Sequence, residues 1–239
     1  STLDRSSAAS DVYKRQVLGS FMRKGFFRRK ADTLLGVDIN DTGIKLIELD
    51  HTAGAYSVKA YVAQGLPANA VVDGTLLDLE GVGQALQQAL SRLHSSVRQA
   101  AVAVSGPSVI TRVIDMEAGL SDEEMAWMIQ MEADQYIPYP LDDVAIDFQV
   151  RGPLAQDSAR VEVVLAACLK EQVEARAAVL ALAGLVARVV DVEGFALERA
   201  CRQDFASFMP GHRVDGAQWA VDAHGMGIAC GLALRSFAG

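Results

Sequence analysis

The feature that most constrains the fold is a pair of β-rich apolar runs within residues 34–50, joined by a polar turn at residues 40–43. Two such runs around a short polar turn predict a β-hairpin. The first run is almost entirely apolar, which predicts a strand covered on both faces. Asp38 interrupts this run two residues before the turn, where a carboxylate is costly to bury unless it meets a cation or hydrogen-bond donors. Asp38 is therefore the first candidate functional residue.

The turn also carries the groups that an anion-binding loop needs. It has backbone N–H groups, the Thr42 hydroxyl, a Gly43 that can adopt positive φ, and Lys45 close behind. Backbone N–H groups in such a turn can hold a phosphate. An ordinary hairpin turn uses the same residue types, and these residues on their own favour that simpler interpretation.

The pattern Gly-Val-Asp-Ile-x-x-Thr-x-x-Lys at residues 36–45 resembles the first phosphate-binding hairpin of the actin-like ATPase superfamily. With the segments below, it resembles the type IV pilus assembly PilM family, which is related to FtsA. The resemblance implies an ATP site in which Asp38 holds Mg²⁺ through water. It places Asn40, Asp41, Thr42, Gly43 and Lys45 around the nucleotide. Asn40 departs from the superfamily pattern, which usually has glycine there.

Two further segments carry the resemblance. Residues 132–140 read Glu-Ala-Asp-Gln-Tyr-Ile-Pro-Tyr-Pro and follow a helix whose start is predicted by a capping box of Ser121 and Glu124. In the PilM family this phrase belongs to subdomain 1C, which FtsA-like proteins insert into their first lobe. Residues 231–237, Gly-Leu-Ala-Leu-Arg-Ser-Phe, resemble the end of a PilM chain.

The expected fold class is α/β. Alternating strand and helix patterns predict a mixed α/β layer, and the resemblance makes this an actin-like (ribonuclease H-like) first lobe with an inserted FtsA-type 1C subdomain. Within it, the pattern predicts a loop at Gly152-Pro153 between two strands. The implied organisation is a non-native leader at 1–16, a basic amphipathic segment at 17–33, subdomain 1A at 34–116, subdomain 1C at 117–184, a return to 1A at 185–204, and a remnant of the second lobe with the C-terminus at 205–239.

Two resemblances concern the rest of the expected nucleotide site. Glu193 follows the predicted strand 185–192, where the superfamily has an acidic residue facing the nucleotide, so Glu193 is expected to orient water around Mg²⁺. The alternative is a glutamate favoured by the dipole at a helix N-terminus. Residues 217–222 resemble the beginning of the second phosphate hairpin, but the chain then runs directly towards its C-terminal phrase. This indicates an internal deletion near 221–222 that removes most of the second lobe. It predicts weak or absent ATP binding and an exposed apolar face on the remaining sheet.

Charge is divided unevenly along the chain. Residues 1–30 carry eight Lys/Arg against two Asp, whereas the whole chain has a net charge of −8, so a basic segment precedes an acidic body. An acidic body argues against nucleic-acid binding. Residues 17–30 mix apolar side chains with basic ones and contain no acidic residue, which suits either contact with an anionic membrane surface or a solvated terminus.

The sequence offers little support for other chemistries. Its three cysteines lack a Cys-x-x-Cys spacing and its four histidines are scattered, which argues against a disulfide framework or a metal cluster. No apolar run reaches the roughly 18 residues that a spanning helix needs.

The resemblance implies a cytoplasmic scaffold, peripheral at the inner membrane, within the type IV pilus assembly complex. Its first lobe and 1C would bind the N-terminal peptide of PilN, either along an exposed strand edge or in an apolar groove. Two alternatives stay open: an actin-like ATPase enzyme, which needs a positioned water and a cation, and an FtsA-like filament-forming cell-division protein. The missing lobe argues against ATP turnover.

Overall fold

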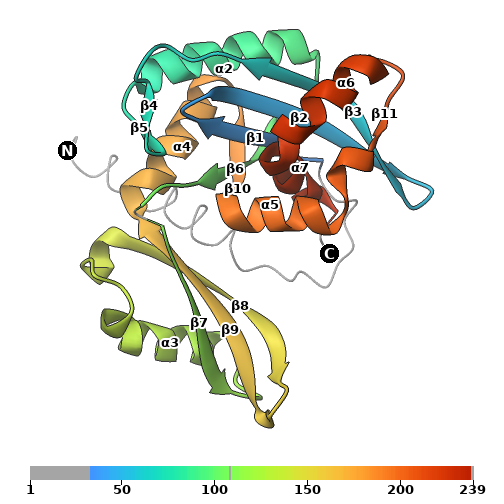
Figure 1. Cartoon of the computed structure of the whole chain (residues 1–239). Helices are drawn as coiled ribbons and strands as arrows, with labels where there is room; N and C mark the ends of the chain where they lie inside the picture. The colour runs from blue at the N-terminus through green and yellow to red at the C-terminus, as the bar shows by residue number, and fades with distance from the viewer. Residues whose placement is uncertain (1–32, 108, 238–239) are drawn as a thin grey trace, which may run out of the picture.

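The computed structural model describes residues 33–107 and 109–237 (Figure 1). The predicted leader at 1–16 and nearly all of the basic amphipathic segment at 17–33 lie outside the described residues. The described chain forms a larger unit around a six-stranded sheet and a smaller unit around a three-stranded sheet (Figure 1). None of the described helices is both long enough and apolar enough to cross a lipid bilayer.

The larger sheet has the strand order β10-β6-β1-β2-β3-β11. The predicted hairpin is confirmed, because the first two strands are antiparallel and Asn40 lies opposite Gly43. β6 runs parallel to both β1 and β10, so the carboxyl ends of these three strands meet at one edge of the sheet. The strands are β1 (Leu35–Asn40), β2 (Gly43–Thr52), β3 (Ala55–Gln64), β6 (Gln99–Val104), β10 (Val186–Val192) and β11 (Met209–Pro210).

Helices cover both faces of this sheet. α2 (Leu79–Leu93) and α4 (Lys170–Leu182) pack on the face that carries Leu35, Val37 and Ile39. The opposite face packs against α5 (Glu193–Arg202) and α7 (Gly227–Ala233). The prediction that a missing lobe would leave an apolar sheet face exposed is therefore wrong for the described residues, since α5 and α7 bury that face.

The C-terminal part is helical where the resemblance implied a strand. Residues 217–222 belong to α6 (Gly216–Asp222), so the implied start of a second phosphate hairpin is wrong. Asp215 begins this helix, because its carboxylate accepts the N–H groups of Ala217 and Gln218. Trp219 is buried, and its ring N–H donates to the carbonyl of Phe208 at 3.1 Å. The segment therefore has its own small core beside β2 and β3.

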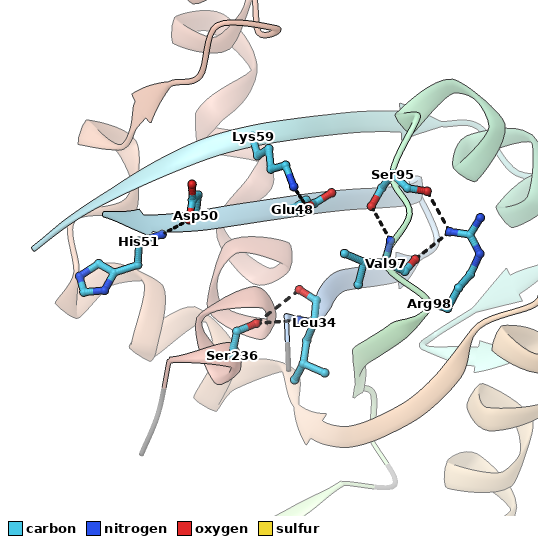
Figure 2. A network of polar contacts seen from close by, with 9 residues as sticks. All are labelled: Leu34, Glu48, Asp50, His51, Lys59, Ser95, Val97, Arg98 and Ser236. Atoms are coloured by element: carbon cyan, nitrogen blue, oxygen red, sulfur yellow. Dashed lines mark hydrogen bonds and ion pairs between the residues drawn. The ribbon is translucent and has the colours of Figure 1, made fainter. Parts of the chain in front are cut away.

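Close packing joins the last helices to the sheet. A Cβ added to Gly231 of α7 would lie 1.7 Å from the carbonyl oxygen of Ala196 in α5, so only glycine permits this helix crossing. Beyond α7, the Ser236 hydroxyl accepts the backbone N–H of Leu34 at 2.8 Å (Figure 2). The two ends of the described chain are thus connected directly.

The smaller unit is an antiparallel sheet of order β7-β9-β8, with one face covered by α3 (Asp122–Glu132). The capping box of Ser121 and Glu124 is confirmed. The strands of this smaller sheet are β7 (Ile110–Glu117), β8 (Val144–Leu154) and β9 (Asp157–Leu169). β7 joins this smaller sheet, whereas α4 packs on the larger one.

The predicted loop at Gly152-Pro153 is wrong. Both residues belong to β8 and pair with Glu162 and Val161 next to register shifts. β8 is an edge strand, and an edge strand tolerates a proline that cannot donate to a neighbour.

Candidate functional site

The predicted anion turn lies at the sheet edge where β1, β6 and β10 end. Asp38 is only 3% exposed at the end of β1. The Lys45 ammonium lies 3.8 Å from Asp38 Oδ2. The side-chain amide of Asn40 donates to both oxygens of this carboxylate, at 3.3 and 3.2 Å. Three predicted site residues are therefore in contact with one another.

Asn40 also closes the turn from within. Its Oδ1 accepts the backbone N–H of Thr42 at 2.9 Å and the Thr42 hydroxyl at 2.6 Å. Gly43 adopts φ of 142°, as the sequence predicted for a glycine at this position. Asp41 Oδ1 accepts the N–H of Gly74 at 3.4 Å, from the turn between β4 (Val71–Val72) and β5 (Thr75–Leu76). The N–H and hydroxyl donors of Thr42 therefore already have partners.

The charges around Asp38 act in opposite directions. Burial raises the pKa of the Asp38 carboxyl to about 6, Lys45 lowers this pKa, and the carboxylate of Glu193 raises it. Glu193 therefore lies close enough for its field to reach Asp38, at the first residue of α5 just beyond β10. The structure thus brings Asp38, Lys45 and Glu193 to the same edge of the sheet.

Arg176 lies behind this site and was missed in the sequence analysis. Its guanidinium is fully buried in α4 and donates to the carbonyls of Ala103 at 2.5 Å and Gly74 at 2.6 Å. Burial lowers its pKa to about 10. A signal was present, because Arg176 falls on the apolar stripe of α4 between Val173 and Leu180. Arg176 holds the β4–β5 turn against the end of β6.

The residues at this edge do not fit ATP and Mg²⁺ as they are arranged. The Thr42 N–H and hydroxyl are bonded to Asn40, and the Asp38 carboxylate is bonded to Asn40 and paired with Lys45. No group of three or more His, Cys, Asp or Glu side chains is placed to hold a metal ion within the part of the chain that the structure describes. The edge is a closed turn in which the side chains of Asp38, Asn40, Thr42 and Lys45 contact one another.

A groove with a volume of about 670 Å³ separates the two units. β8 and β9 of the smaller unit line one side, and α4 with the ends of β6 and β10 lines the other. Most of the lining is apolar, including Ala145, Ala166, Val173 and Val190. Six carboxylates but a single lysine, Lys170, complete it; the acidic residues are Asp142, Asp143, Asp147, Glu171, Glu174 and Asp191.

Two of these carboxylates differ in how they are neutralised. Asp191 is 7% exposed and pairs with Arg199 at 2.9 Å and with Arg235 at 3.3 Å. Asp147 is half-buried on β8 and accepts the backbone N–H of Phe148 at 2.9 Å. Burial raises the pKa of Asp147 to about 6, Arg235 lowers this pKa, and Asp191 raises it. Among the described residues no ion pair involves Asp147, so the groove contains a partly desolvated carboxylate without a direct cation.

A second hollow, of about 950 Å³, lies along the outer edge of β3. On that side β3 pairs with β11 at Ser57 and Val58, so the lining residues 59–63 form an open strand edge among the described strands. Its lining mixes both charges, with Lys59, Arg92 and Arg213 near Glu48 and Asp215. The Lys59 ammonium pairs with the buried Glu48 carboxylate (Figure 2). This hollow offers an exposed strand edge, one of the two peptide sites expected from the resemblance, but its charges are mixed, whereas those of the groove are nearly all negative.

Comparison with known proteins gives the family. The chain is similar over 74% of its length to a solved PilM-PilN type IV pilus biogenesis complex, with 28% identity and a TM-score of 0.65, and spans about half (52%) of that chain. A more distant similarity is to the ethanolamine utilization protein EutJ from Carboxydothermus hydrogenoformans (17% identity, TM-score 0.35, covering 81% of this chain and 47% of that one). The cytoplasmic domain of EpsL from the Vibrio cholerae type II secretion system is likewise distant (15% identity, TM-score 0.34, 68% and 56%). The model for the type IV pilus assembly protein PilM matches residues 36–222, and the chain therefore belongs to the PilM family.

Proposed function

We propose that this protein is a scaffold of the type IV pilus assembly machine that binds the cytoplasmic N-terminal peptide of a PilN protein. The groove between the two units carries the proposal, since it offers an apolar lining of the size that an extended peptide segment needs. The similarity of the chain to a solved PilM-PilN complex supports the same partner. The chain spans half of that relative, so its partner is inferred from the groove and the family together.

The same family supports a finer assignment of the two units. We infer that the six-stranded unit is an actin-like subdomain 1A and that the three-stranded unit is the inserted 1C. The family match ends at Asp222, where the sequence predicts the junction of an internal deletion, and this supports the loss of most of the second lobe. A cytoplasmic position at the inner membrane, with contact through residues 17–30, belongs to the same proposal.

A nucleotide-hydrolysing enzyme is the weaker candidate. The turn around Asp38 is closed by Asn40, and an actin-like site would need groups from a second lobe. We therefore infer weak or no ATP binding for this chain. Micromolar ATP affinity in a calorimetric titration with Mg²⁺, abolished by Asp38→Ala, would contradict this inference and favour the enzyme.

The peptide-binding function is tested by calorimetric titration of the purified chain with a PilN N-terminal peptide. Ala145→Trp places a large side chain in the groove lining and is expected to weaken binding at least tenfold. Ala155→Trp makes the same change at the exposed turn between β8 and β9 and is expected to leave affinity unchanged. Both variants need matching thermal unfolding before their affinities are compared.

One result would reject the proposed partner, and another would reject only its place in the groove. A well-folded chain that binds no PilN peptide would remove the partner. Equal affinity for Ala145→Trp and Ala155→Trp would leave the partner but move its site away from the groove, most directly to the open edge of β3.

A further inference from the structure

The groove is more selective than its apolar lining suggests, because its charge is nearly all of one sign. Four of its carboxylates are exposed at the rim: Asp142, Asp143, Glu171 and Glu174. The only lysine in the lining, Lys170, already donates to the backbone carbonyl of Asp142. Clefts lined by one sign of charge concentrate ligands of the opposite sign. A peptide entering this groove therefore meets a negative field.

Deeper in the groove, the two remaining carboxylates are not equivalent. Asp191 is held by Arg199 from α5 and by Arg235 from the C-terminal segment. Asp147 comes from β8 of the smaller unit, and the charges that act on it are those of Arg235 and Asp191. The Arg235 Nε lies 3.3 Å from Asp191 without forming a hydrogen bond, and among the described residues no ion pair joins a cation to Asp147. Asp147 is the carboxylate best placed to accept a cation from a ligand.

We propose that the groove selects a peptide with a Lys or Arg side chain beside its apolar residues, and that Asp147 receives this positive charge. The proposal rests on the peptide-binding function above and specifies the chemistry of the peptide. Apolar side chains would lie on the alanine and valine lining, and the cation would enter between the units and meet β8. Asp147 thereby acts as a specificity-determining residue, whereas the rim carboxylates act through the wider field.

The arrangement also sets the direction of a pH dependence. Burial holds a proton on Asp147 up to about pH 6, and an arriving cation favours the ionised carboxylate. Binding of the charged peptide therefore releases this proton below pH 6. Affinity should rise as the pH increases from 5 to 7, and this rise should depend on Asp147.

The test is a double-mutant cycle by calorimetry with the full chain at pH 7. The probes are a PilN N-terminal peptide and the same peptide with its Lys and Arg residues replaced by Gln. Asp147→Asn is expected to lower the affinity for the charged peptide about tenfold and the affinity for the neutral peptide less than twofold. Asp143→Asn, at the exposed rim of the same groove, is the matched control and is expected to lower the affinity for the charged peptide about twofold.

Each outcome has one meaning. Binding of both peptides with equal losses in Asp147→Asn overturns the charge proposal but keeps the peptide-binding function. Failure of both peptides to bind the parent chain removes the peptide-binding function itself, and the charge proposal with it. An increase in affinity from pH 5 to pH 7 that is absent in Asp147→Asn supports the assignment, whereas the same increase in both chains contradicts it.

Discussion

The turn around Asp38 and the groove around Asp147 each contain a buried or half-buried aspartate whose pKa is raised to about 6 by burial. They differ in what surrounds the carboxylate. Asp38 has Lys45 and Asn40 from its own hairpin, whereas Asp147 has only the N–H of the following residue and the more distant Arg235. The Asp38 carboxylate thus has its partners within its own hairpin, whereas the Asp147 carboxylate in the groove has no ion-pair partner among the described residues.

This difference separates a structural polar site from a ligand site. Buried polar groups are costly unless they find partners, so a folded chain that leaves a carboxylate unpaired in a groove retains capacity for a ligand. In the closed turn, the Asp38 carboxylate already has Asn40 and Lys45 as partners, which is the basis for the weak ATP binding that we propose. The residue types of a motif are therefore not enough to identify a ligand site. The partners that each side chain already has within the protein decide whether it is free to bind a ligand.

The largest expected effect concerns Arg176 in the closed region. Arg176→Met removes the buried guanidinium that donates to the carbonyls of Ala103 and Gly74. We expect the free energy of unfolding to fall by about 3 kcal/mol. The exposed Arg202, paired with Glu198, is the control, and Arg202→Met should cost less than about 0.5 kcal/mol. Equal urea midpoints for the two variants would show that the region is not held closed as described.

The next effect is a gain in stability. The pKa of Asp38 is higher in the folded chain than its ordinary value of 3.8, so the folded state binds more protons between about pH 4 and pH 6. The contribution of Asp38 to stability therefore falls as the pH rises through this window and is unfavourable above it. Asp38→Asn should stabilise the protein by about 2 kcal/mol at pH 7 and by nothing at pH 4. Thermal unfolding at both pH values, with the exposed Asp50→Asn as control, checks this; a gain that persists at pH 4 would exclude the carboxylate charge as its cause.

A smaller loss is expected when the turn is opened. Asn40→Ala removes the acceptor of the Thr42 N–H and the donor to Asp38, and should cost about 1 kcal/mol. The freed N–H should also give the turn a weak affinity for inorganic phosphate, seen as stabilisation by phosphate that the parent chain lacks. Gln84→Ala on the exposed side of α2 serves as control. Stabilisation of the parent chain by phosphate to the same degree would mean that Asn40 does not block the turn.

The smallest effect distinguishes the two regions by salt. The rim carboxylates of the groove are exposed and are screened by ions, whereas the Asp38–Lys45 pair is largely buried. Raising NaCl from about 0.05 M to about 0.5 M should lower the affinity for the charged PilN peptide a few-fold. The same change should leave the stabilisation of the protein by Asp38→Asn nearly unchanged. The neutral peptide is the control, and an equal salt effect on both peptides would argue against the negative rim.

Much of the fold could be predicted from local patterns. The hairpin follows from two apolar runs around residues 40–43, and the start of α3 follows from Ser121 and Glu124. The strand implied at 217–222 was wrong because the family resemblance was given more weight than the local helix signals of the sequence. Asp215 is a good helix N-cap, and Trp219 and Ala223 are spaced for one helix face. The loop at Gly152-Pro153 failed because an edge strand accepts residues that a central strand rejects.

The sites divide in the same way. Asp38, Asn40 and Lys45 are near one another in sequence, so a hairpin was enough to predict their contact. The charges of Asp191 and Arg235 reach Asp147 only because of how β8, β10 and the C-terminal segment meet, and no local sequence pattern specifies that arrangement. Whether donors in the turn are free also depends on side-chain partners, which residue types do not reveal.

The hydrogen bonds between Leu34 and Ser236 join residues 202 positions apart in the chain. Contacts of such high sequence separation close late, because the entropy of a long loop is lost before the contact is gained. During synthesis, β1 and β2 emerge long before α7 can cover their second face. We therefore expect the nascent chain to hold an uncovered apolar sheet face until α7 leaves the ribosome, which makes it a substrate for chaperones during that interval.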